Sequence, residues 1–300
     1  MKSTKLRSDI GRAGYNELLL FKCLLLGQWY SLSDTALEEA LRVRIDFMLF
    51  ANLKVTDPIP DETTICRFRN LLVKHKLYEK LLKKINQQLE ERGLKLERAD
   101  CAVVDATIIE SACRPSKEIE MMPIDREEEE EIEGNIIHQR LSYDEEARWL
   151  KKGSRSYFGY KGFIVTDDEG YVTEADDDSA NVAECNKLES IGSNIKAKRL
   201  LADKAYGSLK NREYLKSRDI KDGLMYKARR GKTLTAREKL FNKLIAKKRF
   251  VVERCFGTLK QKFQMYRTRY IGVIKVKAQL IMKSICANLL KAANKLIIVG

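Results

Sequence analysis

The sequence predicts an α/β domain preceded by an all-helical domain. Apolar residues recur at helical spacing from residue 16 to about residue 97, with charged residues between them. From Leu94 onward, short apolar runs rich in β-branched residues alternate with helical stretches, which is typical of an α/β domain. We therefore expect a helical domain over residues 1–97 and an α/β domain over residues 98–300, with an acidic insertion near residues 114–155.

The helical domain is expected to contain four helices. Ser33 is a candidate N-cap of the second helix, which we expect to extend to about Phe50. The others are expected over residues 15–30, from Ile65, and over residues 77–92. A basic helical region of this kind is suited to binding DNA, a partner subunit or both.

The α/β domain is expected to contain five strands and four helices. The strands are expected over residues 102–109, 157–166, 171–175, 199–202 and 220–226. The helices are expected over residues 182–193, 208–218, 235–262 and 275–298. Asp167-Asp-Glu-Gly170 predicts a hairpin between the second and third strands. This order of elements is that of a ribonuclease-H-like fold, which is a mixed five-stranded sheet with helices on both faces. It runs as three strands, a helix, a strand, a helix, a strand and then helices.

Two aspartates stand in or directly after predicted strands. Asp105 lies inside an apolar run, where a carboxylate is costly unless it is paired or binds a metal ion. Asp203 follows a second apolar run and precedes a glycine turn. Each residue has a structural alternative, since aspartate at a strand end often caps a turn or the next helix.

A third acid, Glu253, lies in the helix predicted over residues 235–262. Arg249, Phe256 and Lys260 follow the same face of that helix. Taken alone, this row is also explained by ordinary ion pairs along a helix. Together with Asp105 and Asp203, however, Glu253 forms a trio that suits two divalent cations and phosphoryl-transfer chemistry, because Mg²⁺ prefers oxygen ligands.

The charge distribution indicates a polyanionic partner. The chain has a formal net charge of +14, and Glu253 is the only acid among thirteen Lys and Arg residues between positions 246 and 300. A solvated surface is one explanation, and bound nucleic acid is the other. Seven cysteines without close pairing and only two histidines argue against a zinc site and favour a reducing cytoplasm. No apolar run is long enough to span a membrane.

The segment over residues 126–133 is a block of acidic residues. We expect a solvated segment there, with repulsion or mimicry of DNA as an alternative, and we do not expect its glutamates to bind metal.

Several motifs resemble a known family when they are read in order. Near the front these are Pro60-Asp-Glu-Thr-Thr64 and the run from Leu24 to Asp34. Asp105-Ala-Thr-Ile-Ile109, Gly159-Tyr-Lys-Gly162, Ala202-Asp-Lys-Ala-Tyr-Gly207 and Arg249-x₃-Glu253-x₆-Lys260 follow. The chain is similar to bacterial insertion-sequence transposases of the DDE type, specifically insertion-sequence family five. It departs from that family at Ala246, where a tyrosine is usual, at Phe163, where a histidine is frequent, and in a short front end that indicates an N-terminally shortened copy.

The resemblance implies a site and its partners. Asp105, Asp203 and Glu253 would be the catalytic acids and the ligands of two Mg²⁺ ions, for which Mn²⁺ can substitute. The partners would be double-stranded DNA, at the terminal inverted repeats and at the target, and a second copy of the chain, in the bacterial cytoplasm at the nucleoid. Contacts to nucleic acid are expected from six basic residues: Arg249, Lys260, Lys161, Lys204, Arg267 and Arg269.

Two other functions remain open at this point. A ribonuclease-H-like nuclease or resolvase that only cleaves would share the three acids. A non-catalytic DNA-binding protein, derived from a decayed or domesticated transposase, would keep the basic surface without any dependence on metal.

Overall fold

The computed structural model describes residues 14–113, 119–122, 136–139, 143–228, 231 and 233–299. The chain divides into two compact units, Met1–Leu81 and Leu82–Gly300. The division falls inside helix α5 (Leu77–Glu91), so the second half of that helix belongs to the unit that follows. The domain boundary expected at residues 97 and 98 stays a prediction.

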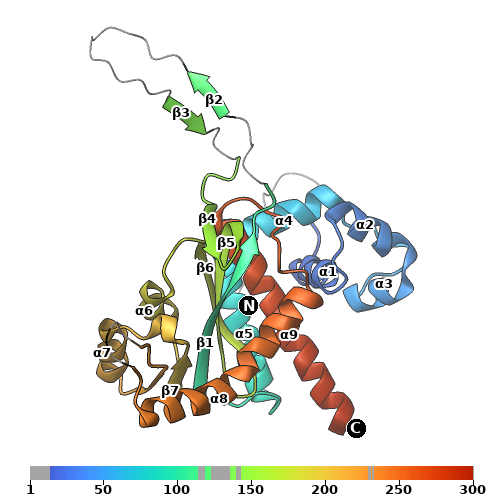
Figure 1. Cartoon of the computed structure of the whole chain (residues 1–300). Coiled ribbons are helices and arrows are strands. Elements are labelled where there is room, and N and C mark those ends of the chain that lie inside the picture. The colour runs from blue at the N-terminus through green and yellow to red at the C-terminus, as the bar shows by residue number, and fades with distance from the viewer. Residues whose placement is uncertain are drawn as a thin grey trace. The chain divides into compact units, whose positions relative to one another are not determined.

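The first unit is helical, as predicted. Its helices are α1 (Glu17–Trp29), α2 (Asp34–Val43), α3 (Ile45–Ala51), α4 (Glu62–Lys74) and the beginning of α5 (Figure 1). Ser33 caps α2 as expected, because its hydroxyl accepts a hydrogen bond from the Ala36 amide.

The second predicted helix is broken at Arg44, so its expected course to Phe50 is wrong. Arg44 has extended backbone angles, with φ −99° and ψ 108°. Its guanidinium lies 3.9 Å from the centre of the Phe47 ring and pairs with Asp46. These contacts accompany the change of direction between α2 and α3.

The second unit is built on a six-stranded mixed sheet. Its strands are β1 (Ala99–Glu110), β4 (Arg148–Lys152), β5 (Arg155–Thr166), β6 (Val172–Ser179), β7 (Ala197–Ala202) and β8 (Lys221–Leu224). The order across the sheet is β4-β5-β1-β7-β8, and β6 also pairs with β5. β1 is antiparallel to β5 and parallel to β7, and β7 is parallel to β8. This mixed sheet with flanking helices confirms the predicted ribonuclease-H-like fold class.

The sheet has one strand more than the five predicted. β4 was missed because its residues, Arg-Trp-Leu-Lys-Lys, are mostly exposed and show no apolar face. Its pairing partner is β5. A polar strand of this kind at a sheet edge is held by its backbone hydrogen bonds, and its sequence carries little signal.

Helices cover both faces of the sheet (Figure 1). On one face, α6 (Leu188–Gly192) and α7 (Leu209–Ser217) pack against Ala102 and Val104 of β1. The helix expected over residues 182–193 is interrupted, since α6 is preceded by a separate 3₁₀ turn, η1 (Glu184–Asn186). Asp105 points to the alternate side of β1, and α8 (Ala236–Gln261) packs against β1 and β7.

The last helix, α9 (Val273–Val299), closes the domain over β6. Its Asn288 side chain accepts a hydrogen bond from the Val172 amide and donates one to the Val172 carbonyl, both at 2.8 Å. The same amide group donates to Asn86 of α5, which also donates to the Val172 carbonyl. This buried network fixes α5, β6 and α9 to one another.

Strands β2 (Ile119–Met122) and β3 (Ile136–Gln139) form a separate antiparallel pair. The acidic block over residues 126–133 lies outside the described residues, so the expectation for it stays untested. Within the described ranges, no helix is both long and apolar enough to cross a bilayer.

Candidate active site

Two of the three predicted acids lie at the same level of neighbouring parallel strands. The register of β1 and β7 pairs Val103 with Leu201, and Asp105 and Asp203 each follow by two residues. Residues two apart along an extended strand point to the same side, so the two carboxylates face the same space. Sequence segments that are far apart are thereby brought together by strand pairing.

Asp105 is the more buried of the two. Its side chain is 17% exposed, and one carboxylate oxygen accepts a hydrogen bond from the Ala106 amide at 2.9 Å. Burial raises the pKa of Asp105, the Arg249 guanidinium opposes this rise, and the charge of Asp203 adds to it.

Asp203 combines a capping role with its position beside Asp105. Its carboxylate accepts a hydrogen bond from the Lys204 amide at 2.6 Å and caps η2 (Lys204–Tyr206). The capping alternative left open by the sequence therefore holds for this residue. The Asp203 side chain is 35% exposed, so one side of it remains open to solvent.

Arg249 connects both aspartates to helix α8. Its guanidinium donates to the Asp105 carboxylate at 2.7 Å and lies 3.8 Å from the Asp203 carboxylate. The Arg249 side chain is only 10% exposed. In this arrangement the positive charge of the arginine offsets one of the two carboxylate charges, and the contact of Arg249 with nucleic acid stays a prediction.

Glu253 lies one turn after Arg249 on α8 and is exposed. The alternative of an ion-pair row along the helix does not apply to Arg249, because this arginine pairs with Asp105 and Asp203. Among the described residues, Glu253 forms no hydrogen bond or ion pair. No three acidic, histidine or cysteine side chains of the described residues lie close enough together to hold a metal ion in this arrangement.

Glu184 is an acid near this site that the sequence did not reveal. It begins η1, and its carboxylate lies 3.7 Å from the ammonium group of Lys161. Burial raises the pKa of Glu184, Lys161 opposes the rise, and the charges of Asp105 and Asp203 reinforce it. No periodicity marks Glu184 in the sequence, because its position depends on the turn that follows β6.

A buried hydroxyl lies in the same neighbourhood. Tyr206 is fully buried, and its hydroxyl has no hydrogen-bond partner among the residues that the structure describes. Burial raises the pKa of Tyr206, and the charges of Glu184 and Asp105 add to this effect. A buried hydroxyl without a hydrogen-bond partner destabilises the fold, so it is not expected where a side chain serves only to pack the core.

The predicted basic contacts differ in their exposure. Lys161 is buried and donates to the Val182 carbonyl at 2.8 Å, and its contact with DNA phosphate stays a prediction. Lys204 and Arg269 are exposed. Arg267 is exposed, but its guanidinium donates to the carbonyls of Ser111 and Ala112.

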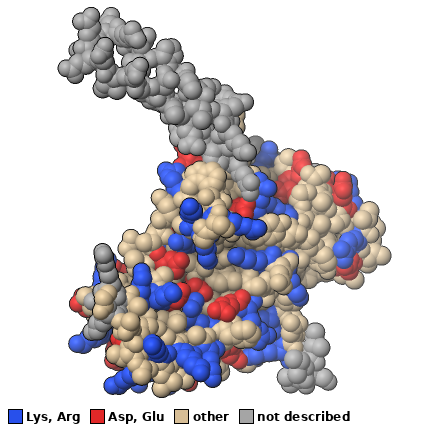
Figure 2. Space-filling model, in the orientation of Figure 1, with Lys and Arg blue, Asp and Glu red and all other residues tan. Residues whose placement is uncertain are grey.

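Lys260, two turns after Glu253, is half-buried. Burial lowers the pKa of Lys260, and the neighbouring charge of Lys152 lowers it further. Figure 2 shows Lys and Arg atoms on several sides of a central group of Asp and Glu atoms. Such a distribution surrounds an acidic site with groups that attract a polyanion.

Comparison with known families agrees with this geometry. Residues 97–289 match the family model described as "Transposase DDE domain". The chain belongs to the DDE transposases. Residues 2–71 of this transposase also match the model described as "Transposase domain (DUF772)".

A curated relative places the transposase among insertion-sequence proteins. The "Transposase for insertion sequence element IS1106" of Neisseria meningitidis serogroup B is 43% identical over 231 residues, which cover 77% of this chain and 78% of that protein. No solved structure matches the chain. The predicted family, a bacterial insertion-sequence transposase of the DDE type, is confirmed.

One departure of this transposase from the family pattern has a structural explanation. Phe163, at the position where a histidine is frequent, is fully buried and packs in the core beneath α6 and α7. Its ring stabilises the sheet face and leaves no room for a polar role there. Ala246, at the position of the usual tyrosine, is exposed on α8.

Proposed function

We propose that this transposase cuts DNA at the ends of its own insertion sequence and joins the freed 3′ ends to target DNA. Asp105, Asp203 and Glu253 are the acids assigned to the reaction. The observation that carries the proposal is the shared contact of Asp105 and Asp203 with Arg249, one helical turn before Glu253. In this proposal, three distant segments supply the acids of one site.

The side chains at this place fit a divalent cation. Carboxylate oxygens are the ligands that Mg²⁺ and Mn²⁺ prefer, and such ions usually take only a few of them. Asp105 and Asp203 already share one positive group, the Arg249 guanidinium, so the site attracts positive charge. Two Mg²⁺ ions, when bound by the three acids, would supply activation of water and stabilisation of charge at the scissile phosphate.

The protein itself positions the reacting groups. Arg249 holds the two aspartates in place and balances their charge. Lys204 is exposed beside Asp203, and Lys260 is half-exposed on α8, so both can contact DNA phosphates. The attacking groups are water and then the 3′-hydroxyl of the DNA, so the reaction requires no nucleophilic side chain.

The partners follow from the reaction. Each insertion sequence has two ends, which must be brought together before both are joined to one target. We therefore propose that two copies of the chain act together on double-stranded DNA, in the bacterial cytoplasm at the nucleoid. The Arg267 and Arg269 segment would extend the DNA contact beyond the acids.

The decisive experiment is a cleavage assay on duplexes that carry the inverted repeats flanking the gene. Wild-type protein with Mg²⁺ is expected to cut at the ends, and Asp203→Asn and Glu253→Gln are expected to bind the same DNA without cutting it. Asp100→Asn is the matched control, because Asp100 lies on the same strand as Asp105 but is exposed and pairs with Lys198.

Two results would contradict the proposal. Cutting by Asp203→Asn or Glu253→Gln at the wild-type rate would remove these acids from the reaction. Tight binding of the ends by the wild-type protein, without cutting in Mg²⁺ or Mn²⁺, would instead favour a non-catalytic DNA-binding protein.

A further inference from the structure

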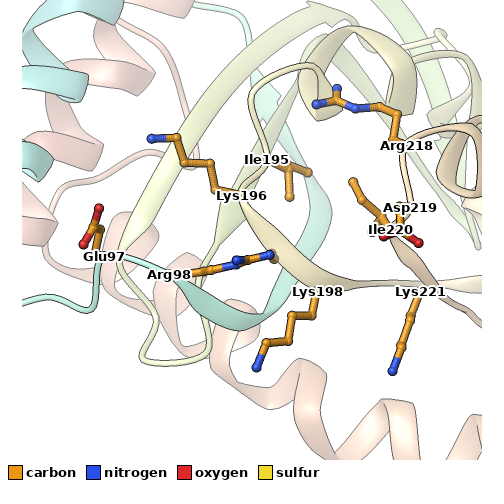
Figure 3. Close-up of a pocket in the computed structure, with 10 residues that line it drawn as sticks. Glu97, Arg98, Ile195, Lys196, Lys198, Arg218, Asp219, Ile220 and Lys221 are labelled. Carbon is orange, nitrogen blue, oxygen red and sulfur yellow. The ribbon is translucent and has the colours of Figure 1, made fainter.

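A basic pocket lies at the edge of the sheet where the parallel strands β1, β7 and β8 begin (Figure 3). Its volume is about 500 Å³. Asp203 follows the opposite end of β7, which is six residues long. At roughly 3.3 Å per residue, the pocket and the Asp203 end of this strand are about 16 Å apart.

Positive side chains dominate the lining of this pocket. They come from three separate segments of the chain and are Arg98, Lys196, Lys198, Arg218 and Lys221. Glu97 and Asp219 are the acids among the lining residues. In Figure 3, Lys198 and Lys221 extend from neighbouring strands in the same direction. Like charges around one pocket repel one another, and a bound anion would offset this repulsion.

Two of the five cations are fixed by the protein. Arg218 donates to the carbonyls of Gly192 and Ser193, and Lys198 pairs with Asp100 at 2.7 Å. The other three, Arg98, Lys196 and Lys221, are exposed. None of these three forms a hydrogen bond or ion pair with another residue in the described part of the chain. Their charges are therefore available to a ligand.

The chemistry of the lining favours the backbone of a nucleic acid over a small phosphorylated molecule. The apolar lining residues are Ile195, Ala197 and Ile220, and no aromatic ring lines the pocket. A nucleotide site usually offers a surface on which the base can stack, in an enclosed cavity. A DNA backbone requires only separated cations, which are present here.

We propose that this pocket binds the phosphate backbone of duplex DNA without regard to sequence, as an anchor away from the cutting site. The proposal rests on DNA being the partner of the proposed function, but it does not depend on the cutting chemistry. Lys196 and Lys221 supply two of the contacts, with Arg98 beside them.

The test is the salt dependence of binding to a duplex of random sequence. Binding is measured by fluorescence anisotropy in EDTA, so that no cutting occurs, between about 50 and 200 mM salt. The double variant Lys196→Gln/Lys221→Gln is compared with Lys80→Gln/Lys275→Gln, which removes the same charge from exposed lysines outside the pocket. Circular dichroism and thermal unfolding of both variants establish that they fold.

Each phosphate contact contributes about −0.9 to the slope of log affinity against log salt. Loss of two contacts should therefore reduce the slope by about 1.8, so that the affinity lost over this salt range is roughly tenfold smaller than for the wild type. The control variant should keep the wild-type slope.

An unchanged slope in the pocket variant would overturn the proposal. Binding of ATP or tripolyphosphate by the wild type, lost in the pocket variant while the DNA slope is unchanged, would also overturn it and indicate a small-ligand site. Failure of the wild type to cut its DNA ends would refute only the proposed function, because binding in EDTA is measured independently.

Discussion

Arg249→Gln tests the electrostatic design of the site directly. The Arg249 side chain is 10% exposed and that of Asp105 is 17% exposed, so the variant leaves a largely buried carboxylate without its cation. Breaking a buried pair from one side costs about 3–5 kcal/mol. The Asp203 side chain is 35% exposed, so water solvates it even when Arg249 is absent. We therefore expect the free energy of unfolding to fall by an amount near the lower limit, about 3 kcal/mol at pH 7.5.

This loss should depend on pH. Burial already raises the pKa of Asp105, and removal of Arg249 removes the main influence that lowers it. A carboxyl group whose pKa is raised by folding stabilises the folded state at low pH, and this contribution is lost as the pH rises through the raised pKa. The variant should therefore be closer to wild-type stability at pH 5 than at pH 7.5.

Divalent cations should rescue the variant. With the guanidinium absent, Mg²⁺ bound by Asp105 and Asp203 would supply positive charge to the two carboxylates. At a concentration ten times its dissociation constant, Mg²⁺ would restore about 1.4 kcal/mol. For a domain of roughly 200 residues, 1 kcal/mol corresponds to about 2–4 °C in the melting temperature.

The assay is thermal and urea unfolding at pH 5 and pH 7.5, with MgCl₂ or with KCl of equal ionic strength. Arg254→Gln is the matched control, since Arg254 is an exposed arginine on the same helix, and a change within about 0.5 kcal/mol is expected for it. An equal loss of stability at both pH values would refute the reasoning.

Two further predictions concern other buried acids. Burial, and then the charge of Asp176, raises the pKa of Asp177 to about 8, and within the described part of the chain neither of its carboxylate oxygens has a hydrogen-bond partner. The wild type therefore loses stability as the pH rises from about 4 through about 8, and above pH 8 the free energy of unfolding of Asp177→Asn should exceed that of the wild type by up to ~6 kcal/mol. Urea unfolding at pH 5 and pH 9 measures this difference, and an equal gain at both pH values would contradict the prediction. Glu184→Gln should raise the Mg²⁺ concentration needed for half-maximal cleavage by about tenfold and leave DNA affinity unchanged, as expected of a positioning residue near the acids. Weaker DNA binding with an unchanged Mg²⁺ dependence of cleavage would exclude this role.

Much of the fold was predictable because the central strands have strong local patterns. β1 and β7 are apolar runs. An acid within or directly after such a run indicates a candidate functional site, because a buried carboxylate is costly unless it is paired or binds a metal ion. β4 has no such pattern, because an exposed edge strand needs no apolar residues. The break at Arg44 depends on contacts with Phe47 and Asp46 that compete with a locally favourable helix.

The sequence singled out the candidate site residues but not the contacts that they make. Helical spacing correctly placed Arg249 and Glu253 one turn apart, but it could not show that Arg249 would pair across 144 residues of sequence with Asp105. Lys161 appeared in a motif that suggested a surface role, yet strand pairing buries it beside Glu184. Both outcomes are set by which side of the sheet a residue faces, and that is decided by long-range packing.

The position of α9 has a consequence for how the protein is made. Asn288 forms hydrogen bonds to residues that are 116 and 202 positions earlier in the chain, so β6 and α5 gain this partner only after residue 288 has been synthesised. A chain that ends before residue 273 lacks this helix and leaves the face of β6 uncovered. Such a product exposes apolar surface and unpaired backbone groups, and it becomes a substrate for proteases. A stop codon shortly before residue 273 should therefore remove the protein as completely as an earlier one.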